Sequence, residues 1–221
     1  MRPATPASLF SGHPWTYPGE PLAQPARLEP WELAGRRPVV AFGSNTDPAV
    51  VRDKLSRGGI HSEIPMTPAV LPDVALAASA HVSVGGYIPA AVQHRAGSRL
   101  RVVVSWPDPE QLACLDASEP NYRPVVVRDL ELLDGRRIGA ALLYATRRGV
   151  VELPGPLPQV GVWRHVLACV PGLAEVCGVG PDASGPALRE LMLAAADSAT
   201  LRGRITRRLQ AVAVPAGLPQ R

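Results

Sequence analysis

Residues 39–48 read Val39-Val40-Ala41-Phe42-Gly43-Ser44-Asn45-Thr46-Asp47-Pro48. The apolar run at 39–42 predicts a short buried strand, and Gly43 permits a tight turn after it. Asp47 followed by Pro48 is typical of a helix N-cap and first helical residue, so we expect a helix over 48–57. A polar turn between strand and helix exposes backbone N–H groups, which favour a carboxylate or phosphate ligand. On these ten residues alone, a capped helix without a ligand is the simpler interpretation.

The regions on either side of this stretch differ in composition. The chain has 221 residues, enough for one well-buried domain with appendages, and 25 of them are proline. Proline is dense over residues 1–37, which predicts an extended or irregular N-terminal extension. That extension also carries four aromatic residues, Phe10, Trp15, Tyr17 and Trp31. These aromatic side chains favour packing on the domain or on a partner chain over simple disorder.

Residues 38–153 carry the patterns typical of strands and short helices. Runs rich in β-branched residues predict strands over 74–84, 87–94, 99–106, 122–128, 130–133 and 138–146. A proline-punctuated connector is expected over 60–73, a turn at 96–98, and a short helix over 110–117. Strands in mostly neighbouring order with short helices between them predict an α+β fold, a small mixed, mainly antiparallel β-barrel.

From residue 154 the periodicity becomes helical. Helices are expected over 161–170, 186–196 and 198–213, so 154–221 is predicted to be a helical C-terminal extension packed on the barrel. The last helix carries the arginine-rich run 202–208 opposite an apolar stripe. This pattern is typical of an ordinary amphipathic helix with a solvated face, and contact with nucleic acid or an anionic membrane is the alternative.

The charge and the cysteines exclude several classes of protein. The formal net charge is +4 with a pI near 9.3, and Lys54 is the only lysine, so arginine supplies the positive charge. The arginines are scattered, which makes nucleic-acid binding an unfavoured interpretation. The three cysteines have no CxxC spacing, which indicates neither a metal site nor disulfides. No stretch has the length of a signal peptide core or a membrane span, so we expect a cytoplasmic protein with no membrane partner.

A second stretch, at 115–123, reads Leu115-Asp116-Ala117-Ser118-Glu119-Pro120-Asn121-Tyr122-Arg123. Here a predicted helix ends in two carboxylates three residues apart, before a proline turn and a strand. A Glu between a helix end and a sheet can be partly desolvated, which raises the pKa of a carboxyl group toward the range useful for proton transfer. Taken alone, however, a helix-terminal Glu is usually a solvated surface charge.

Together these stretches resemble the gamma-glutamylcyclotransferase-like, or avirulence-induced-gene-like, family. Phe42-Gly43-Ser44-Asn45 is similar to the family's Tyr-Gly-Ser-Asn turn, and the stretch 115–123 to its Leu-Asp-x-x-Glu-Gly signature followed by Tyr. Residues 85–92 are similar to a third motif, Gly-x-x-Pro-Ala-x-Val, and the resemblance covers about 38–150. Phe42 stands where the family has Tyr, and Pro120 where it has Gly.

The resemblance implies a barrel with a cavity and an amine-releasing cyclotransferase or acyltransferase that uses no metal or cofactor. A gamma-glutamyl amine or peptide would cyclise to 5-oxoproline and release its amine, with Glu119 as general acid/base. Phe42, Gly43, Ser44, Asn45 and Tyr122 would bind a small substrate with a free carboxylate. A non-catalytic module that binds a small ligand on the same fold is the alternative. A homodimer stays open.

Overall fold

The computed structural model describes residue 10 and residues 12–218. The chain divides into two compact units, each built from segments that are separate in the sequence. The first, here called the helical unit, comprises Met1–Tyr17, Ala78–Pro89 and Arg148–Val214. The second, the barrel unit, comprises Pro18–Ala77, Ala90–Arg147 and Pro215–Arg221. Residues 1–9 and 11 of the predicted N-terminal extension, and 219–221 of the C-terminal one, lie outside the described residues. The division into 1–37, 38–153 and 154–221 stays a prediction.

The barrel is a closed ring of five strands. They are β1 (Val39–Ala41), β2 (Met66–Ser79), β3 (Ala90–Ser105), β4 (Tyr122–Leu132) and β5 (Arg137–Thr146). Their order is β3-β1-β5-β4-β2, an additional β3–β2 pairing closes the ring, and a sixth strand, β6 (Val150–Glu152), follows β2. The β1–β5 pair is parallel, whereas β1–β3, β2–β4 and β4–β5 are antiparallel. The predicted α+β fold with a mixed, mainly antiparallel barrel is therefore confirmed.

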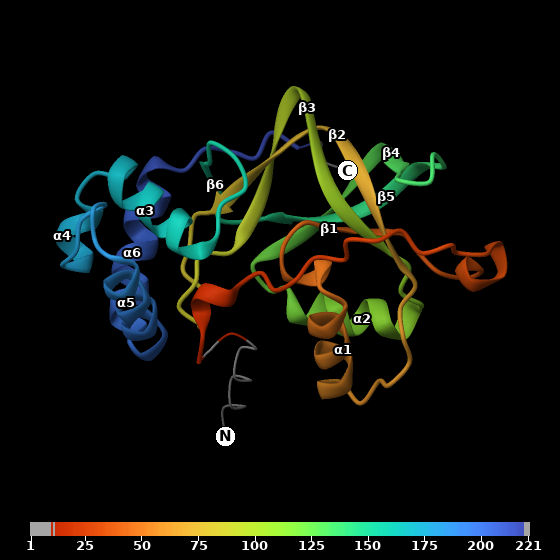
Figure 1. Ribbon diagram of the computed structural model, residues 1–221, viewed down its shortest axis with the longest axis horizontal. Coiled ribbons are helices and arrows are strands. Elements are labelled where there is room, and N and C mark those ends of the chain that lie inside the picture. The colour runs from red at the N-terminus through yellow and green to blue at the C-terminus, as the bar shows by residue number, and fades with distance from the viewer. Residues whose placement is uncertain (1–9, 11, 219–221) are drawn as a thin grey trace. The chain divides into compact units, whose positions relative to one another are not determined.

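Two helices of the barrel unit follow the capping signals in the sequence. After β1, the 3₁₀ turn η3 (Ser44–Thr46) leads into α1 (Pro48–Arg57), where Asp47 accepts the Ala49 N–H at 2.8 Å. This N-cap and the predicted helix 48–57 are both confirmed. The second helix, α2 (Pro109–Ser118), lies beside α1 (Figure 1). Apolar side chains from both helices, including Val51, Leu55 and Leu115, join one buried cluster.

The strands β2 and β3 differ from the predicted pattern. The expected connector at 60–73 is wrong over its second half, because β2 already begins at Met66 and runs through Pro68 and Pro72. A strand proline lacks only a donor, and the Pro68 carbonyl still accepts the Leu133 N–H at 3.3 Å. The turn predicted at 96–98 lies inside the single strand β3, where Gly97 has a φ of +78°. The Gly97 N–H donates to Asp73 Oδ1 at 2.7 Å, so this distortion is held by a side chain from β2.

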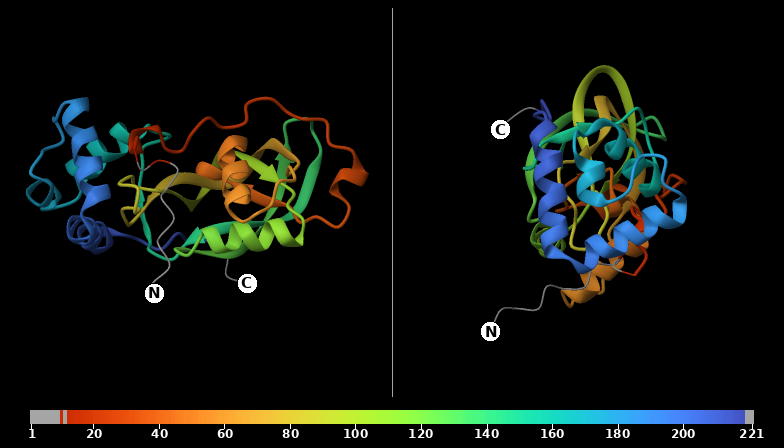
Figure 2. Two further views of the ribbon diagram at one scale, coloured as in Figure 1. Left: turned by 90° about the horizontal axis from the view of Figure 1, so that it is seen from below. Right: turned by 90° about the vertical axis from the view of Figure 1, so that its left-hand side faces the viewer.

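The helical unit has four α-helices: α3 (Gln159–Cys169), α4 (Leu173–Cys177), α5 (Gly185–Asp197) and α6 (Ala199–Val212). They gather together in both views of Figure 2. Trp163 of α3, fully buried, lies in their shared core with Leu188, Met192, Ile205 and Leu209. Three of these helices match the predicted ones within two residues, whereas α4 and β6 were not predicted. Both elements are short, and each has too few residues to show a period.

Two short 3₁₀ helices lie in the N-terminal part of the described chain. They are η1 (Pro14–Thr16) in the helical unit and η2 (Pro30–Leu33) in the barrel unit. In η1, Trp15 lies under the Arg189 guanidinium, 5.3 Å from the ring centroid, which is a cation–π contact within the helical unit. This part of the predicted extension is therefore packed, as its aromatic residues suggested.

A buried histidine lies in the helical unit. His81 is 5% exposed, and its Nδ1 lies 2.9 Å from Ser79 Oγ. Burial, reinforced by the positive charge of Arg148, lowers the pKa of His81 from 6.5 to about 4. The imidazole is therefore neutral near pH 7 and is hydrogen-bonded to the Ser79 hydroxyl.

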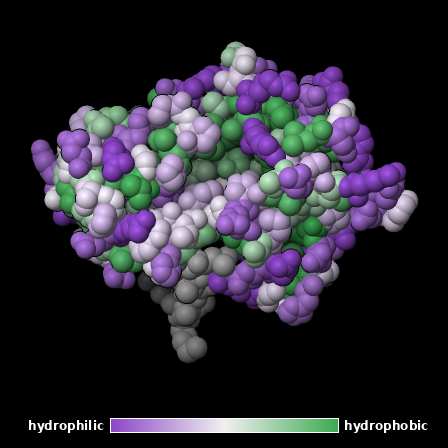
Figure 3. All heavy atoms as spheres, in the orientation of Figure 1, coloured by the Kyte–Doolittle hydropathy of each residue, from purple (hydrophilic) through white to green (hydrophobic). Residues whose placement is uncertain are grey.

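On the face shown in Figure 3, hydrophilic side chains alternate with apolar ones. No helix in the described residues is long and apolar enough to cross a membrane.

Candidate active site

Three polar side chains, two of them from the predicted stretches, form a closed triangle in the barrel unit. Glu119 Oε1 accepts hydrogen bonds from Lys54 Nζ at 2.9 Å and from Asn45 Nδ2 at 3.2 Å. Lys54 Nζ also donates to Asn45 Oδ1 at 2.7 Å. The side chains of Lys54 and Glu119 are both 17% exposed, so this ion pair is largely withdrawn from water. The second carboxylate oxygen, Oε2, accepts no hydrogen bond within the described chain.

The local fold explains why these residues meet. Asn45 lies in η3, Lys54 follows on α1, and Glu119 is the C-cap residue of α2. Because α1 packs on α2, the last turns of the two helices are close, and Cys114 Sγ of α2 lies 3.7 Å from the Lys54 carbonyl oxygen. The site therefore depends on the packing of one helix on the other and not on either helix alone.

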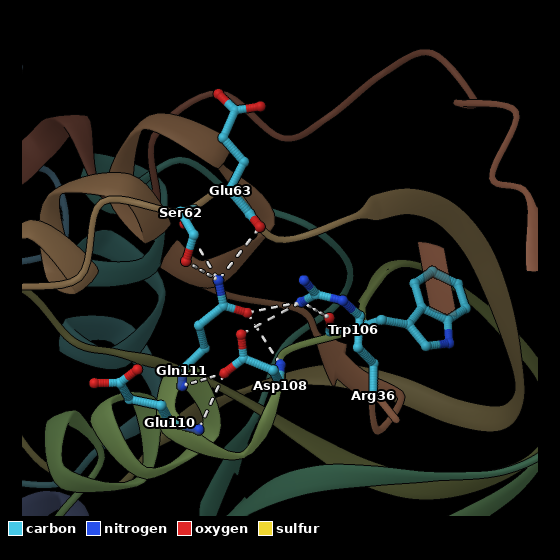
Figure 4. Close-up of polar contacts among 7 residues, drawn as sticks. All are labelled: Arg36, Ser62, Glu63, Trp106, Asp108, Glu110 and Gln111. Carbon is cyan, nitrogen blue, oxygen red and sulfur yellow. Dashed lines mark hydrogen bonds and ion pairs between the residues drawn. The ribbon is translucent and has the colours of Figure 1, made fainter. Parts of the chain in front are cut away.

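The start of α2 is fixed by a buried glutamine (Figure 4). Gln111, fully buried, accepts at Oε1 from Arg36 at 2.9 Å and from the Asp108 N–H at 3.0 Å. Its Nε2 donates to Ser62 Oγ at 2.9 Å and reaches the Ser62 and Glu63 carbonyls. Asp108 in turn accepts the Glu110 and Gln111 N–H groups, which completes a capping box. This network anchors one end of α2, so Glu119 at the other end is held on a rigid element.

A tyrosine and a second carboxylate lie next to Glu119. The Tyr144 hydroxyl on β5 donates to Asp116 Oδ1 at 2.5 Å. Burial raises the pKa of Tyr144 far above its usual value, and the hydrogen bond to Asp116 and the negative charges of Asp116 and Glu119 act in the same direction. Tyr144 therefore keeps its proton and serves as a hydrogen-bond donor at neutral pH. This bond ties the last turn of α2 to the barrel.

The other predicted site residues lie at different distances from the triangle. The Gly43 carbonyl accepts from Thr46 N–H at 2.9 Å and Thr46 Oγ1 at 2.7 Å, which closes the turn that presents Asn45. The N–H groups of Ser44 and Asn45 donate to no other group in the part of the chain that the structure describes. Phe42 instead packs, half-buried, against the apolar barrel core. The structure thus brings Asn45 and its turn to Glu119, whereas Phe42 belongs to the core.

Tyr122 has a connecting position. Its N–H donates to the Glu119 carbonyl at 3.0 Å, and its hydroxyl donates to the Ala90 carbonyl at 3.0 Å. Ala90 belongs to the third motif, at 85–92, so Tyr122 joins that motif to the Glu119 turn. Its hydroxyl already has this backbone partner, so the geometry favours positioning of the turn over direct contact with a ligand.

Sequence reasoning missed Lys54 and Tyr144. Lys54 did carry a signal, since it is the only lysine in a chain that otherwise uses arginine. A compact ammonium can approach a carboxylate and an amide together, which a planar guanidinium does less well. Tyr144 lies in an apolar strand and carried no such signal. Among the described residues, no three His, Cys, Asp or Glu side chains come together as metal ligands.

The site as built can exchange a proton and hold an anion. Among the residues described, nothing donates to Glu119 Oε2 beside the Lys54 ammonium, and the Ser44 and Asn45 N–H groups of the adjoining turn have no acceptor. A carboxylate aligned by one oxygen and open at the other suits general acid/base chemistry. Turn amides without partners suit a carboxylate or a developing oxyanion.

Comparisons with known proteins found solved structures of low similarity to this chain. No protein-family model matches the chain, and no curated protein sequence matches it. Similar solved structures include one titled gamma-glutamyl cyclotransferase, with 15% identity, a TM-score of 0.46, and 71% of this chain and 86% of that chain covered. An Arabidopsis thaliana solution structure has 22% identity, a TM-score of 0.40, and 51% and 70% covered. An uncharacterized protein from Homo sapiens has 13% identity, a TM-score of 0.44, and 85% and 93% covered. One of these neighbours has the name of the family that the motifs resemble.

Proposed function

We propose that the Glu119 site catalyses the cyclisation of a gamma-glutamyl amine or peptide to 5-oxoproline with release of the amine. The observation that carries the proposal is the triangle of Asn45, Lys54 and Glu119, which leaves one carboxylate oxygen free beside unpaired turn amides. No metal or cofactor is needed for this reaction, because it is an intramolecular acyl transfer.

The proposed reaction moves protons through Glu119 and holds negative charge on the turn. Glu119 Oε2 takes a proton from the α-ammonium group of the substrate, and the freed amine attacks the γ-carbonyl carbon. The C–N bond to the leaving group then breaks, and Glu119 returns the proton to the departing nitrogen. The attacking nitrogen loses a second proton as it becomes an amide, and this proton passes to the released amine, which leaves as an ammonium ion. The Ser44 and Asn45 N–H groups hold the negatively charged oxygens of the substrate. Lys54 and Asn45 occupy Oε1, so the proton moves through Oε2.

A non-catalytic binding module is the second candidate, and one observation favours it. Glu119 is already neutralised by Lys54 at 2.9 Å, and a paired carboxylate is suited to holding an ammonium group as well as to moving a proton. Such a module would bind glutamate-like ligands at the same turn and release them unchanged.

The test is turnover of a panel of gamma-glutamyl amines and peptides, with 5-oxoproline and the free amine as the measured products. Glu119→Gln keeps the shape of the side chain and removes the base, so kcat should fall by about 10²–10⁴-fold. Glu110→Gln is the matched control, because Glu110 is exposed on the same helix, and it should retain wild-type turnover.

The two candidates separate cleanly in this assay. Turnover by the wild type that persists in Glu119→Gln would contradict the proposed role of Glu119. Calorimetric binding of 5-oxoproline by the wild type, without turnover of any compound in the panel, would select the binding module.

A further inference from the structure

Three arginines of the helical unit line one cavity. Arg204, Arg207 and Arg208 on α6 surround a space of about 350 Å³, and Ala211 of α6 and Val176 of α4 complete its wall. The arginines stand three and four residues apart, so they share one side of α6, whereas Ile205 and Leu209 on the other side are buried in the core.

The positive charge in this cavity has no bonded counter-charge in the part of the chain that the structure describes. Within the described residues, none of these three guanidinium groups forms a hydrogen bond or an ion pair. Arg202 on the same helix differs, because it donates to the Ala195 and Ala196 carbonyls at 2.8 and 2.6 Å. Like charges at these spacings destabilise a helix. The helix dipole does not offset this cost, because it acts mainly within the last turn and α6 ends at Val212.

One of the guanidinium groups lies close to the backbone before α4. Arg208 lies over Gly172, the residue before α4, which has a φ of +69°. A Cβ atom at Gly172 would lie 3.1 Å from Arg208 Cζ, so glycine serves both the left-handed backbone and the close approach of the guanidinium. Arg208, although exposed, therefore lies beside the connection between α3 and α4.

We propose that this cavity binds a small molecule bearing several phosphate groups. Guanidinium groups donate through a planar fork that matches phosphate oxygens, and three of them offer more positive charge than a single carboxylate balances. The volume lies near the lower end of the range of small-ligand sites, and the Val176 and Ala211 side chains offer apolar contact to the rest of the ligand.

The shape favours a small ligand over a nucleic acid. A surface that binds a duplex needs basic residues along an extended track, whereas here the unpaired arginines surround a single recess. The inference is independent of the reaction proposed at Glu119, because every residue it uses belongs to the helical unit.

The experiment is calorimetric titration of the full chain with inorganic triphosphate, at low and at physiological salt. The wild type should bind, and Arg204→Gln, Arg207→Gln and Arg208→Gln should each weaken binding by about fivefold or more, because each removes a charge-assisted contact. The triple variant should show no binding. Arg128→Gln, which removes one exposed arginine of the barrel unit, is the matched control and should bind as the wild type does.

Three further outcomes complete the test. Vesicles of phosphatidylcholine with and without a phosphoinositide distinguish a lipid headgroup from a free phosphate, and arginine-dependent binding to either supports the site. Triphosphate binding that survives the triple substitution overturns the proposal. Failure to bind triphosphate, combined with retention on duplex DNA that grows with duplex length, also overturns it in favour of a nucleic-acid surface.

Discussion

The Glu119 triangle and the arginine cavity handle charge in opposite ways. In the triangle, a cation and an anion face each other at 2.9 Å, and an amide bridges both. In the cavity, three cations share one recess with no anion of the described chain bonded to them. The charges of the triangle are balanced without a ligand. The charges of the cavity are balanced only when a ligand brings negative charge.

The two sites should respond in opposite directions when a charged side chain is removed. Removing one partner of a partly buried, hydrogen-bonded ion pair lowers the stability of the protein, because the other charge is left without compensation. Unpaired like charges act the other way, since removing one relieves repulsion. Whether a substitution lowers or raises the unfolding free energy therefore distinguishes the two kinds of site.

The largest expected effect concerns His81, which is buried and differs from both sites because its side chain is neutral near pH 7. Its pKa is lowered to about 4 in the folded protein, so between pH 6.5 and 4 the unfolded chain binds a proton that the native state excludes. Stability of the helical unit should therefore fall as the pH falls through this window, by roughly 3 kcal/mol. Urea unfolding at a series of pH values measures the slope, and titration of the His81 ring by NMR measures its pKa directly.

The control for this prediction uses a second histidine. His81→Gln should flatten the slope between pH 6.5 and 4, whereas exposed His61→Gln should preserve it. An unchanged slope in His81→Gln, or an NMR midpoint near 6.5, would show that burial of His81 does not govern the acid sensitivity.

The sequence predicted most of the fold because its signals are local. Asp47 with Pro48 and Asp108 with Pro109 each mark a helix start through contacts with the next few residues, and both were recognisable in the chain. The distorted strands were not, since the φ of +78° at Gly97 is supported by Asp73, which is distant in sequence. From the local sequence alone, such a glycine predicts an ordinary turn, because the remote side chain that supports it lies outside the pattern.

The site was predictable only where its residues stand in motifs. Asn45 and Glu119 lie in the two stretches that the sequence singles out, and the structure joins them directly. Lys54 and Tyr144 enter the site through the packing of α1 on α2 and of α2 on the barrel. No local pattern encodes such packing. Phe42, whose place in a motif predicted a ligand contact, packs half-buried against the barrel core, and its contact with a ligand stays a prediction.

The second prediction breaks the paired site. Lys54→Met keeps the length of the side chain and removes the ammonium, which leaves Glu119 without its cation. Because both side chains are 17% exposed, we expect a loss of about 1–3 kcal/mol in unfolding free energy, between the values for surface and buried pairs.

A double-mutant cycle isolates the pair. Glu119→Gln combined with Lys54→Met should cost less than the sum of the two single changes, by about 1 kcal/mol or more. Additive effects would show that the 2.9 Å contact contributes no coupling. Since Lys54 is the only lysine, an amine-specific reagent provides a second measurement: Glu119→Gln should speed labelling of Lys54 over the wild type, with the chain's α-amine as an internal reference.

The smallest expected effect is a gain in unfolding free energy, at the arginine cavity. Arg204 has like charges three and four residues away, at Arg207 and Arg208, so Arg204→Gln should raise the unfolding free energy by about 0.5 kcal/mol at low salt. Salt should shrink the gain, because it screens the repulsion in the wild type. Arg128→Gln should change stability little, since the structure gives Arg128 no like-charged helical neighbour. If Arg204→Gln gains stability while its affinity for triphosphate falls, the arginines are retained at a cost to folding, as expected of a binding site. If it loses stability instead, Arg204 has a structural partner and the contrast with the Glu119 triangle fails.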